Sequence, residues 1–325
     1  MNRKKIENCR YKSGFIDLNK LKNYREKGVV VEGSNAKTWF NVNGVRFLFK
    51  EYNSILPCFG EVLYYNAAKM CGVDCAEYDF ATMDGKVGTI SYDFLNSTEV
   101  YYNFLELSSQ FGDSKFNLDD IVDNRNMLVL RNNQYNNLSA IRMIISELFR
   151  CSSDKKEEIE VSLIKMVCLD TLFCHLDRTL WNYGVIVDED IDEFRLVPLY
   201  DNSYVLYLHR GESYIEEGIY DLINEDISTG SQLEFKCDST ISDFIEFYSN
   251  CSEDRRAIIE GIVNKLNVDE LYDSTSKYCE IGKVYELWIK ALLNFRKKTI
   301  LRGLESVRIM DDEAQIPNVA FSKRK

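Results

Sequence analysis

Two tight-turn signals near the N-terminus constrain the fold of this chain more than any other feature. The pair Asn43-Gly44 lies between two β-rich runs, and the pair Asp84-Gly85 repeats the pattern later in the chain. Both pairs suit the type I′ turn that joins neighbouring antiparallel strands. We therefore predict two hairpins, with strands over residues 38–42, 45–50, 78–83 and 86–92.

Helical patterns dominate the rest of the chain. One helix is predicted between the hairpins, over residues 59–70, and Gly72 ends it. After about residue 95, helical spacing appears near residues 118–123, 137–149, 154–174, 241–248, 253–266 and 284–306. A short ribbon over residues 185–199 interrupts it, and a loop-like stretch runs from there to about residue 239. We expect an α+β fold with two lobes, a β-rich N-lobe (1–95) and a larger helical C-lobe (96–325).

The composition of the chain argues against nucleic acid and membrane as partners. The 325 residues carry a net charge of −12, which repels nucleic-acid backbones and anionic lipid, so we expect no direct nucleic-acid binding. Apolar runs are too short to span a bilayer, and no apolar segment follows the basic start, so we expect neither a membrane span nor a signal peptide. Ten scattered cysteines suit a reducing compartment, which indicates a cytoplasmic protein.

Three oxygen-bearing side chains have the spacing of a phosphoryl-transfer site. Asp177 precedes Asn182 by five residues, and Asp201 follows at the end of the predicted ribbon. A loop carboxylate such as Asp177 can orient and deprotonate a hydroxyl, whereas Asn182 and Asp201 offer the oxygen ligands that Mg²⁺ prefers. Each also has an ordinary interpretation, because Asp and Asn commonly cap and form turns. The three in register favour catalysis for Asp177 and metal binding for the other two.

Lys50 and Glu61 form a second candidate group. Strand alternation places Lys50 opposite the aromatic face of its strand, where it can meet nucleotide phosphates. Glu61 is predicted in the first turn of the following helix, where it can pair with Lys50 or simply complement the helix dipole. A solvated lysine at the end of a strand remains the alternative for Lys50.

Weaker nucleotide-binding signals lie at both ends of the first sheet. Gly33, Ser34, Asn35 and Lys37 belong to a short polar loop that can cradle phosphates, although an ordinary loop leading into a strand has the same composition. Asp93 stands where the β-rich part gives way to the helical part, and its backbone is a candidate contact for an adenine edge.

Two further polar residues belong to the long helix predicted before the catalytic loop and to the start of that loop. Asp170 interrupts the apolar stripe of residues 154–174, so it either pairs with the loop that follows or reaches water at the edge of the stripe. We expect His175 to brace the loop through hydrogen bonds and not to act as a general base. His209 has no evident catalytic part.

These motifs together resemble the HipA-like serine/threonine kinases, including the small CtkA-type members. The resemblance covers most of the chain and depends on the following blocks: Gly33-Ser34-Asn35-Ala36-Lys37-Thr38, Lys50, Gly60-Glu61, His175-Leu176-Asp177-Arg178 with Asn182 and Gly184, and Pro198-Leu199-Tyr200-Asp201. It implies a bilobal protein-kinase-like fold, the cofactors ATP and Mg²⁺, and transfer of a phosphoryl group to a serine or threonine of a protein substrate. It also implies Asp177 as the catalytic residue, Lys50 as the nucleotide lysine, and Asn182 and Asp201 as metal ligands.

The chain departs from the larger HipA-type toxins at its start. Its glycine loop begins near residue 33, so we expect their N-terminal subdomain to be absent or vestigial. An antitoxin-like partner is therefore compatible with the family but unsupported by this sequence. The family's autophosphorylation makes Ser34 and Thr38 candidate acceptors by position.

Two alternatives to a protein kinase remain open. A small-molecule kinase of the aminoglycoside- or choline-kinase type has a similar loop, and an acidic surface suits a cationic substrate. A catalytically silent, kinase-like binding module is the other alternative, although Lys50, Asp177, Asn182 and Asp201 are all present.

Overall fold

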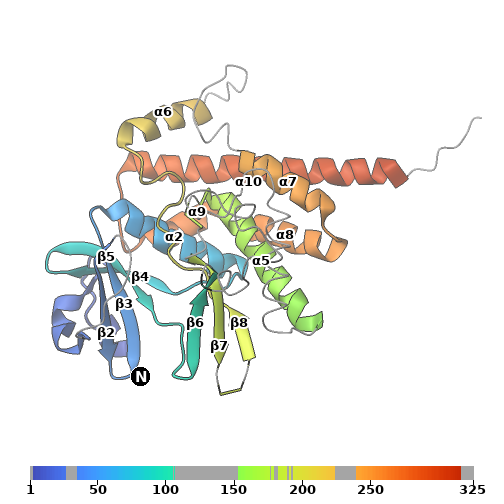
Figure 1. The fold of residues 1–325 in the computed structure, drawn as a ribbon. Helices are drawn as coiled ribbons and strands as arrows, with labels where there is room; N and C mark the ends of the chain where they lie inside the picture. The colour runs from blue at the N-terminus through green and yellow to red at the C-terminus, as the bar shows by residue number, and fades with distance from the viewer. Residues whose placement is uncertain are drawn as a thin grey trace, which may run out of the picture.

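Five strands form a sheet in the N-terminal part of the molecule (Figure 1). Along the sheet the order is β1 (Ile16–Asp17), β4 (Tyr78–Met83), β5 (Lys86–Tyr92), β3 (Val45–Tyr52) and β2 (Lys37–Val42). Both predicted hairpins are confirmed, because φ is positive at Asn43, Gly44, Asp84 and Gly85, as a type I′ turn requires. The short β1 pairs with β4 in parallel.

The computed structural model describes residues 3–26, 35–104, 106, 153–175, 177–178, 182–188, 190–191, 193–223 and 239–315. The helices predicted near residues 118–123 and 137–149 lie outside this part of the chain, and so do Gly33 and Ser34.

Helix α2 (Ile55–Cys71) covers one face of the five-stranded sheet and ends, as predicted, at Gly72 in the left-handed conformation. The predicted start at residue 59 was wrong by one turn. Pro57 is tolerated in the first turn, because the N–H groups there have no partner within the helix. Glu61 therefore lies in the second turn of α2, not in the first.

The other face of the sheet has a core of its own. Helix α1 (Arg3–Glu7) and the 3₁₀ segment η1 (Leu18–Tyr24) pack there. Their apolar side chains meet the aromatic side chains of the strands, and the buried members include Ile6, Leu18, Leu21, Phe40, Phe47, Phe49 and Ile90. The aromatic face predicted for β3 is thus core, which leaves Lys50 on the face toward α2.

A second sheet lies between Asn182 and Asp201 in the sequence and includes one earlier strand. Its strand order is β6 (Glu99–Asn103), β7 (Gly184–Asp188) and β8 (Glu193–Leu196). The ribbon predicted over residues 185–199 is confirmed as β7 and β8. Strand β6 corrects the expectation of helix beyond residue 95, and its pairing with β7, which is distant in sequence, decides its conformation.

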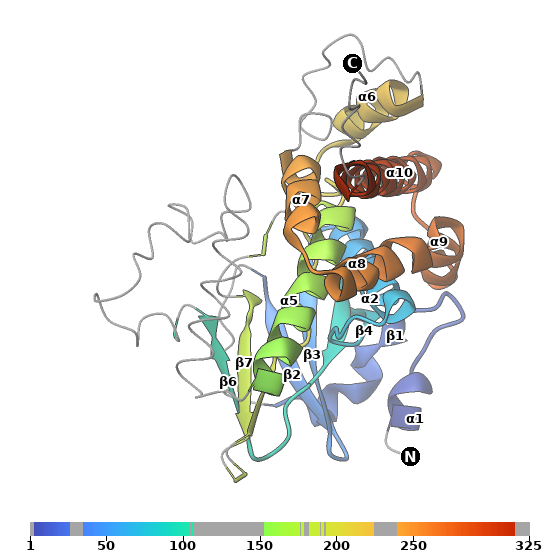
Figure 2. The same cartoon turned by 90° about the vertical axis from the view of Figure 1, so that its right-hand side faces the viewer.

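Six helices are described in the rest of the chain: α5 (Ser153–Phe173), α6 (Glu212–Ile223), α7 (Ser239–Asn250), α8 (Glu253–Lys265), α9 (Val268–Ser276) and α10 (Lys283–Gln315). Helices α6 and α9 were not predicted, and α6 replaces part of the expected loop. Figure 1 shows α10 running lengthwise above α2, α5, α8 and α9, and Figure 2, turned by 90°, shows it nearly end-on with α6 above it. None of the described helices is long and apolar enough to cross a membrane.

The hydrophobic core continues from α2 into the C-terminal helices. Phe59 of α2, for example, packs against Tyr272 of α9 with ring centroids 5.8 Å apart. The lobe boundary at residue 95 stays a prediction, since α2 and the C-terminal helices share this core.

Gly184 at the start of β7 is required by close packing against β6. A Cβ atom there would lie 2.1 Å from the carbonyl oxygen of Tyr102. We expect Gly184→Ala to lower the free energy of unfolding by about 1–3 kcal/mol, as overpacking does. Urea denaturation would measure this, with Gly261→Ala in α8 as the control, because a Cβ atom at that position meets nothing within 4 Å. Equal effects of the two substitutions would contradict the prediction.

Candidate active site

A buried ion-pair cluster joins the first sheet, α2 and the segment after β8. The Lys50 ammonium on β3 donates to Glu61 Oε1 at 3.3 Å and also to Asp201 Oδ1. The Thr89 hydroxyl of β5 donates to the other oxygen of Glu61 at 2.5 Å. Lys50 is 8% exposed and Glu61 is fully buried. The structure thus brings Lys50, Glu61 and Asp201 together, although they come from three separate parts of the sequence.

The charges of this cluster stabilise one another. Burial disfavours the Lys50 ammonium, but the carboxylates of Glu61 and Asp201 outweigh this and raise the pKa of Lys50. Burial likewise opposes ionisation of Asp201, and the Lys50 ammonium outweighs it and lowers the pKa of Asp201. Both groups are therefore charged at neutral pH.

Lys37 adds a second ammonium beside the first. It lies directly opposite Lys50 in the β2–β3 register, so both side chains are on the same face of the sheet. Burial lowers the pKa of Lys37, and the charge of Lys50 lowers it further, while Asp201 opposes the effect. Two like charges side by side on a half-buried face are unfavourable alone and suit a polyanionic ligand such as a nucleotide triphosphate.

The end of α5 leads into the loop that bears Asp177. Cys174 has a left-handed conformation, with φ of 47°, and the His175 N–H bonds back to the Asp170 carbonyl at 2.9 Å. The buried guanidinium of Arg296 on α10 donates twice to the Thr171 carbonyl, at 2.9 and 2.6 Å, and so caps the helix.

His175 braces the loop, as predicted. Its Nδ1 atom accepts a hydrogen bond from the Asp177 N–H at 3.2 Å. Burial, together with the nearby Arg178 charge, lowers the pKa of His175 to about 4. The ring is therefore neutral at physiological pH and keeps Nδ1 as an acceptor.

Asp177 and Asn182 lie next to each other across the loop. The Asn182 Nδ2 atom donates to the Asp177 carbonyl at 3.0 Å, which leaves the Asn182 Oδ1 atom to bind a cation. Burial and the negative charge of Asp201 raise the pKa of Asp177, whereas the Lys50 ammonium opposes the shift. The pKa of Asp177 therefore depends on the charges of both Asp201 and Lys50.

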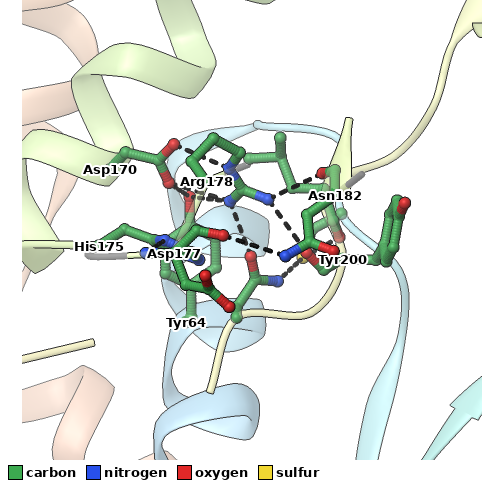
Figure 3. A network of polar contacts seen from close by, with 10 residues as sticks. Tyr64, Asp170, His175, Asp177, Arg178, Asn182 and Tyr200 are labelled. Atoms are coloured by element: carbon green, nitrogen blue, oxygen red, sulfur yellow. Dashed lines mark hydrogen bonds and ion pairs between the residues drawn. The ribbon is translucent and has the colours of Figure 1, made fainter. Parts of the chain in front are cut away.

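Arg178 is the centre of a buried network that joins the loop of Asp177 and Asn182 to the turn at Asp201 (Figure 3). Its guanidinium, 1% exposed, donates to both carboxylate oxygens of Asp170, at 2.9 and 3.0 Å. It also donates to the carbonyls of Asn182 at 3.3 Å and Tyr200 at 3.0 Å, and to Asn202 Oδ1 at 2.8 Å. Of the two interpretations left open for Asp170, pairing with the following loop is confirmed.

The backbone at Asp201 is held in an uncommon conformation. Its φ of 55° lies in the left-handed region, and its N–H donates to the Tyr78 hydroxyl at 2.9 Å. With Asn202 bound to Arg178, contacts on both sides fix this turn. They support the placement of the Asp201 carboxylate beside Lys50.

Two of the predicted nucleotide contacts lie at the edges of this arrangement. Asn35 lies two residues before Lys37, the first residue of β2. The Asp93 carboxylate accepts hydrogen bonds from Arg46 at 2.9 Å and from the Leu95 N–H at 3.1 Å. Among the described residues, no hydrogen bond or ion pair joins Asp93 to the Lys50 cluster, so only its backbone remains a candidate nucleotide contact.

The site residues that sequence reasoning missed are the supporting ones. Arg178, Tyr64, Asn202 and Thr89 hold the candidate catalytic groups in place. One signal was available, because a carboxylate within an apolar stripe needs a partner, and Arg178 follows Asp170 by eight residues.

Comparisons with known proteins bear on the fold of the chain. No family model and no curated protein matches the chain. Among solved structures, the proinflammatory kinase CtkA of Helicobacter pylori matches with a TM-score of 0.66 and 14% identity, over 92% of this chain and 99% of that chain. The chain has the fold of this kinase. The likeness confirms the predicted α+β, kinase-like fold and, at the level of the fold, the resemblance to the CtkA-type kinases.

A second solved structure is more distant. A chain of the Shewanella oneidensis MR-1 toxin–antitoxin complex of HipA, HipB and operator DNA matches with a TM-score of 0.40 and 12% identity. That match covers 87% of this chain and 67% of the other.

Proposed function

We propose that this protein is an ATP-dependent kinase that transfers the γ-phosphoryl group to a serine or threonine hydroxyl of a protein. The observation that carries the proposal is the buried contact of Lys50 with both Glu61 and Asp201. The loop that bears Asp177 and Asn182 is tied to the Asp201 turn through Arg178. The kinase fold shared with CtkA supports it.

The residues present fit a nucleotide with Mg²⁺. Asp201 offers a carboxylate and Asn182 an amide oxygen, and Mg²⁺ commonly takes only one or two protein ligands beside phosphate and water. The ammonium groups of Lys37 and Lys50 supply the positive charge that phosphates need. When bound, the metal would neutralise the charge that develops on the phosphates. Asn35, Gly33 and Ser34 are proposed to line the phosphate loop, and the Asp93 backbone is proposed to meet the base.

Asp177 is proposed as the catalytic base. The acceptor hydroxyl would form the new P–O bond and pass its proton to the Asp177 carboxylate, while the bond to the leaving diphosphate oxygen breaks. The raised pKa of Asp177 makes it a better proton acceptor than an ordinary aspartate.

We further propose a cytoplasmic location and autophosphorylation at Ser34 or Thr38. A protein partner of the antitoxin type is the last part of the proposal.

Incubation of the purified protein with γ-labelled ATP and Mg²⁺ tests the proposal. We expect label to enter protein, on serine or threonine, when the kinase is incubated with a cell extract as the source of acceptors. Label that enters only small molecules, aminoglycosides or choline included, would favour a small-molecule kinase. Nucleotide-dependent thermal stabilisation without any transfer would instead indicate a silent binding module.

A further inference from the structure

Helix α2 carries two polar side chains that lead to different parts of the site. Glu61 and Tyr64 are three residues apart, so they lie on neighbouring turns of one helix face. Glu61 binds Lys50 in the sheet at 3.3 Å. Tyr64 contacts α5 instead, and its hydroxyl donates to Asp170 Oδ1 at 2.5 Å. One rigid helix therefore touches both the nucleotide lysine and the base of the catalytic loop.

The Tyr64 hydroxyl is one end of the Arg178 network (Figure 3). Asp170 Oδ1 accepts from Tyr64 and also from Arg178 Nη2, which itself lies 3.4 Å from the Tyr64 oxygen. From Arg178, hydrogen bonds continue to the main chain of Asn182 and of Tyr200. Asp170 and Arg178 thus link α2 to both loops that bear the candidate metal ligands.

The Tyr64 ring makes a second contact with the same loop. It packs edge-on against His175, with centroids 5.8 Å apart, and His175 accepts the Asp177 N–H. Tyr64 is fully buried, and Asp170 is 5% exposed. In such a buried setting, hydrogen bonds strengthen one another and the loss of a partner is costly.

We infer that Tyr64 is a positioning residue. It couples the position of α2, and with it the Lys50–Glu61 pair, to the geometry of the loops that bear the candidate catalytic and metal-binding residues. This inference rests on the proposed kinase function. Tyr64 touches none of the reacting groups and acts through Asp170 and Arg178. A shift of α2 that separates Glu61 from Lys50 would also withdraw the Tyr64 hydroxyl from Asp170.

Tyr64→Phe tests the hydroxyl alone, because the ring and its packing remain. We expect a fall in kcat of about 10- to 100-fold, as for supporting residues around metal ligands, with a KM for the protein acceptor within about twofold of the wild type. Tyr183→Phe is the matched control. The Tyr183 hydroxyl is also buried beside this loop but has no hydrogen-bond partner in the described part of the chain, so kcat is expected to stay unchanged.

A double-mutant cycle with Glu61→Gln separates coupling from a merely structural effect. If α2 transmits the effect, Tyr64→Phe should lower kcat much less in the Glu61→Gln background than in the wild type. Independent, multiplying effects of the two substitutions would overturn the inference, and so would a wild-type kcat for Tyr64→Phe.

Hydrogen exchange of the nucleotide-free protein tests the network without any activity. Tyr64→Phe is expected to speed amide exchange in residues 182–188 and 200–203, whereas Tyr183→Phe is not. Unchanged exchange would overturn the inference even if the wild type is an active kinase. Absence of phosphoryl transfer by the wild type, together with faster exchange in Tyr64→Phe, would instead refute the proposed kinase function and leave the network intact.

Discussion

Asp177→Ala is expected to abolish measurable phosphoryl transfer while Mg·ATP still binds. Asp177 lies just beyond α5, its N–H is held by His175, and the Asn182 side chain donates to its carbonyl. The substitution keeps these backbone contacts and removes only the carboxylate. Loss of a general base costs about 10²- to 10⁴-fold in rate. A labelled-ATP assay would measure transfer, and calorimetry would measure nucleotide binding.

Asp201→Ala is the matched counterpart, since it removes the other carboxylate of the site. Asp201 is the stronger candidate metal ligand and a direct partner of Lys50. We expect this variant to lose Mg·ATP affinity itself, whereas Asp177→Ala retains it. If both variants bound Mg·ATP as the wild type does, Asp201 would not be a metal ligand.

The pH dependence of transfer follows from the same two carboxylates. Burial and the charge of Asp201 raise the pKa of Asp177, so its basic form is lost at a higher pH than for an ordinary aspartate. Asp201 stays ionised there, because Lys50 outweighs the effect of burial and lowers the pKa of Asp201. The acid limb of kcat/KM is therefore expected above the ordinary aspartate range. A limb within or below that range would argue against Asp177 as the base.

Local chemistry explains which parts of the fold were predictable. The hairpins at Asn43-Gly44 and Asp84-Gly85 depend on turn residues that few other conformations accept, so the sequence alone identified them. Strand β6 was not predicted, because its five residues become a strand only by pairing with β7, more than eighty residues later. The start of α2 was misplaced because Pro57 looks like a helix breaker although a first turn tolerates it.

The candidate site shows a similar division. Spacing alone pointed to Asp177, Asn182 and Asp201, because the chemistry of phosphoryl transfer limits which residues can stand there. Spacing does not show what holds them, since Arg178 acquires its role from its surroundings: Asp170, Tyr64 and Asn202 come from α5, α2 and the Asp201 turn. The one local sign of this network in the sequence was Asp170, a carboxylate that interrupts the apolar stripe of its helix.

Arg178→Met is expected to lower the free energy of unfolding by about 3–5 kcal/mol, which is the effect of breaking a buried ion pair by removing one partner. Methionine has a similar length, so the main loss is the charge and its hydrogen bonds to Asp170, Asn182, Tyr200 and Asn202. The Asp170 carboxylate would then be buried without a counterion. Urea denaturation at neutral pH would measure the change.

Arg255→Met is the matched control for this substitution. Arg255 binds Glu160 through Nε at 2.8 Å and Nη2 at 3.1 Å, the same two-pronged contact, but both side chains are about a quarter exposed. Solvent screens such a pair, so its loss is expected to cost at most about 1 kcal/mol. Equal costs for Arg178→Met and Arg255→Met would mean that burial of the Arg178 network contributes little to stability.

A second substitution, at Asp170, tests whether the uncompensated charge causes the loss. In Arg178→Met, burial without a counterion should raise the pKa of Asp170 above its unfolded value, opposite to the lowering by Arg178 in the wild type. The deficit relative to the wild type should then shrink as pH falls, because the protonated carboxyl is tolerated in the core. Adding Asp170→Asn to Arg178→Met should recover part of the lost stability at neutral pH. If the double variant recovers no stability, the deficit comes from the lost loop contacts and not from the Asp170 carboxylate left without a counterion.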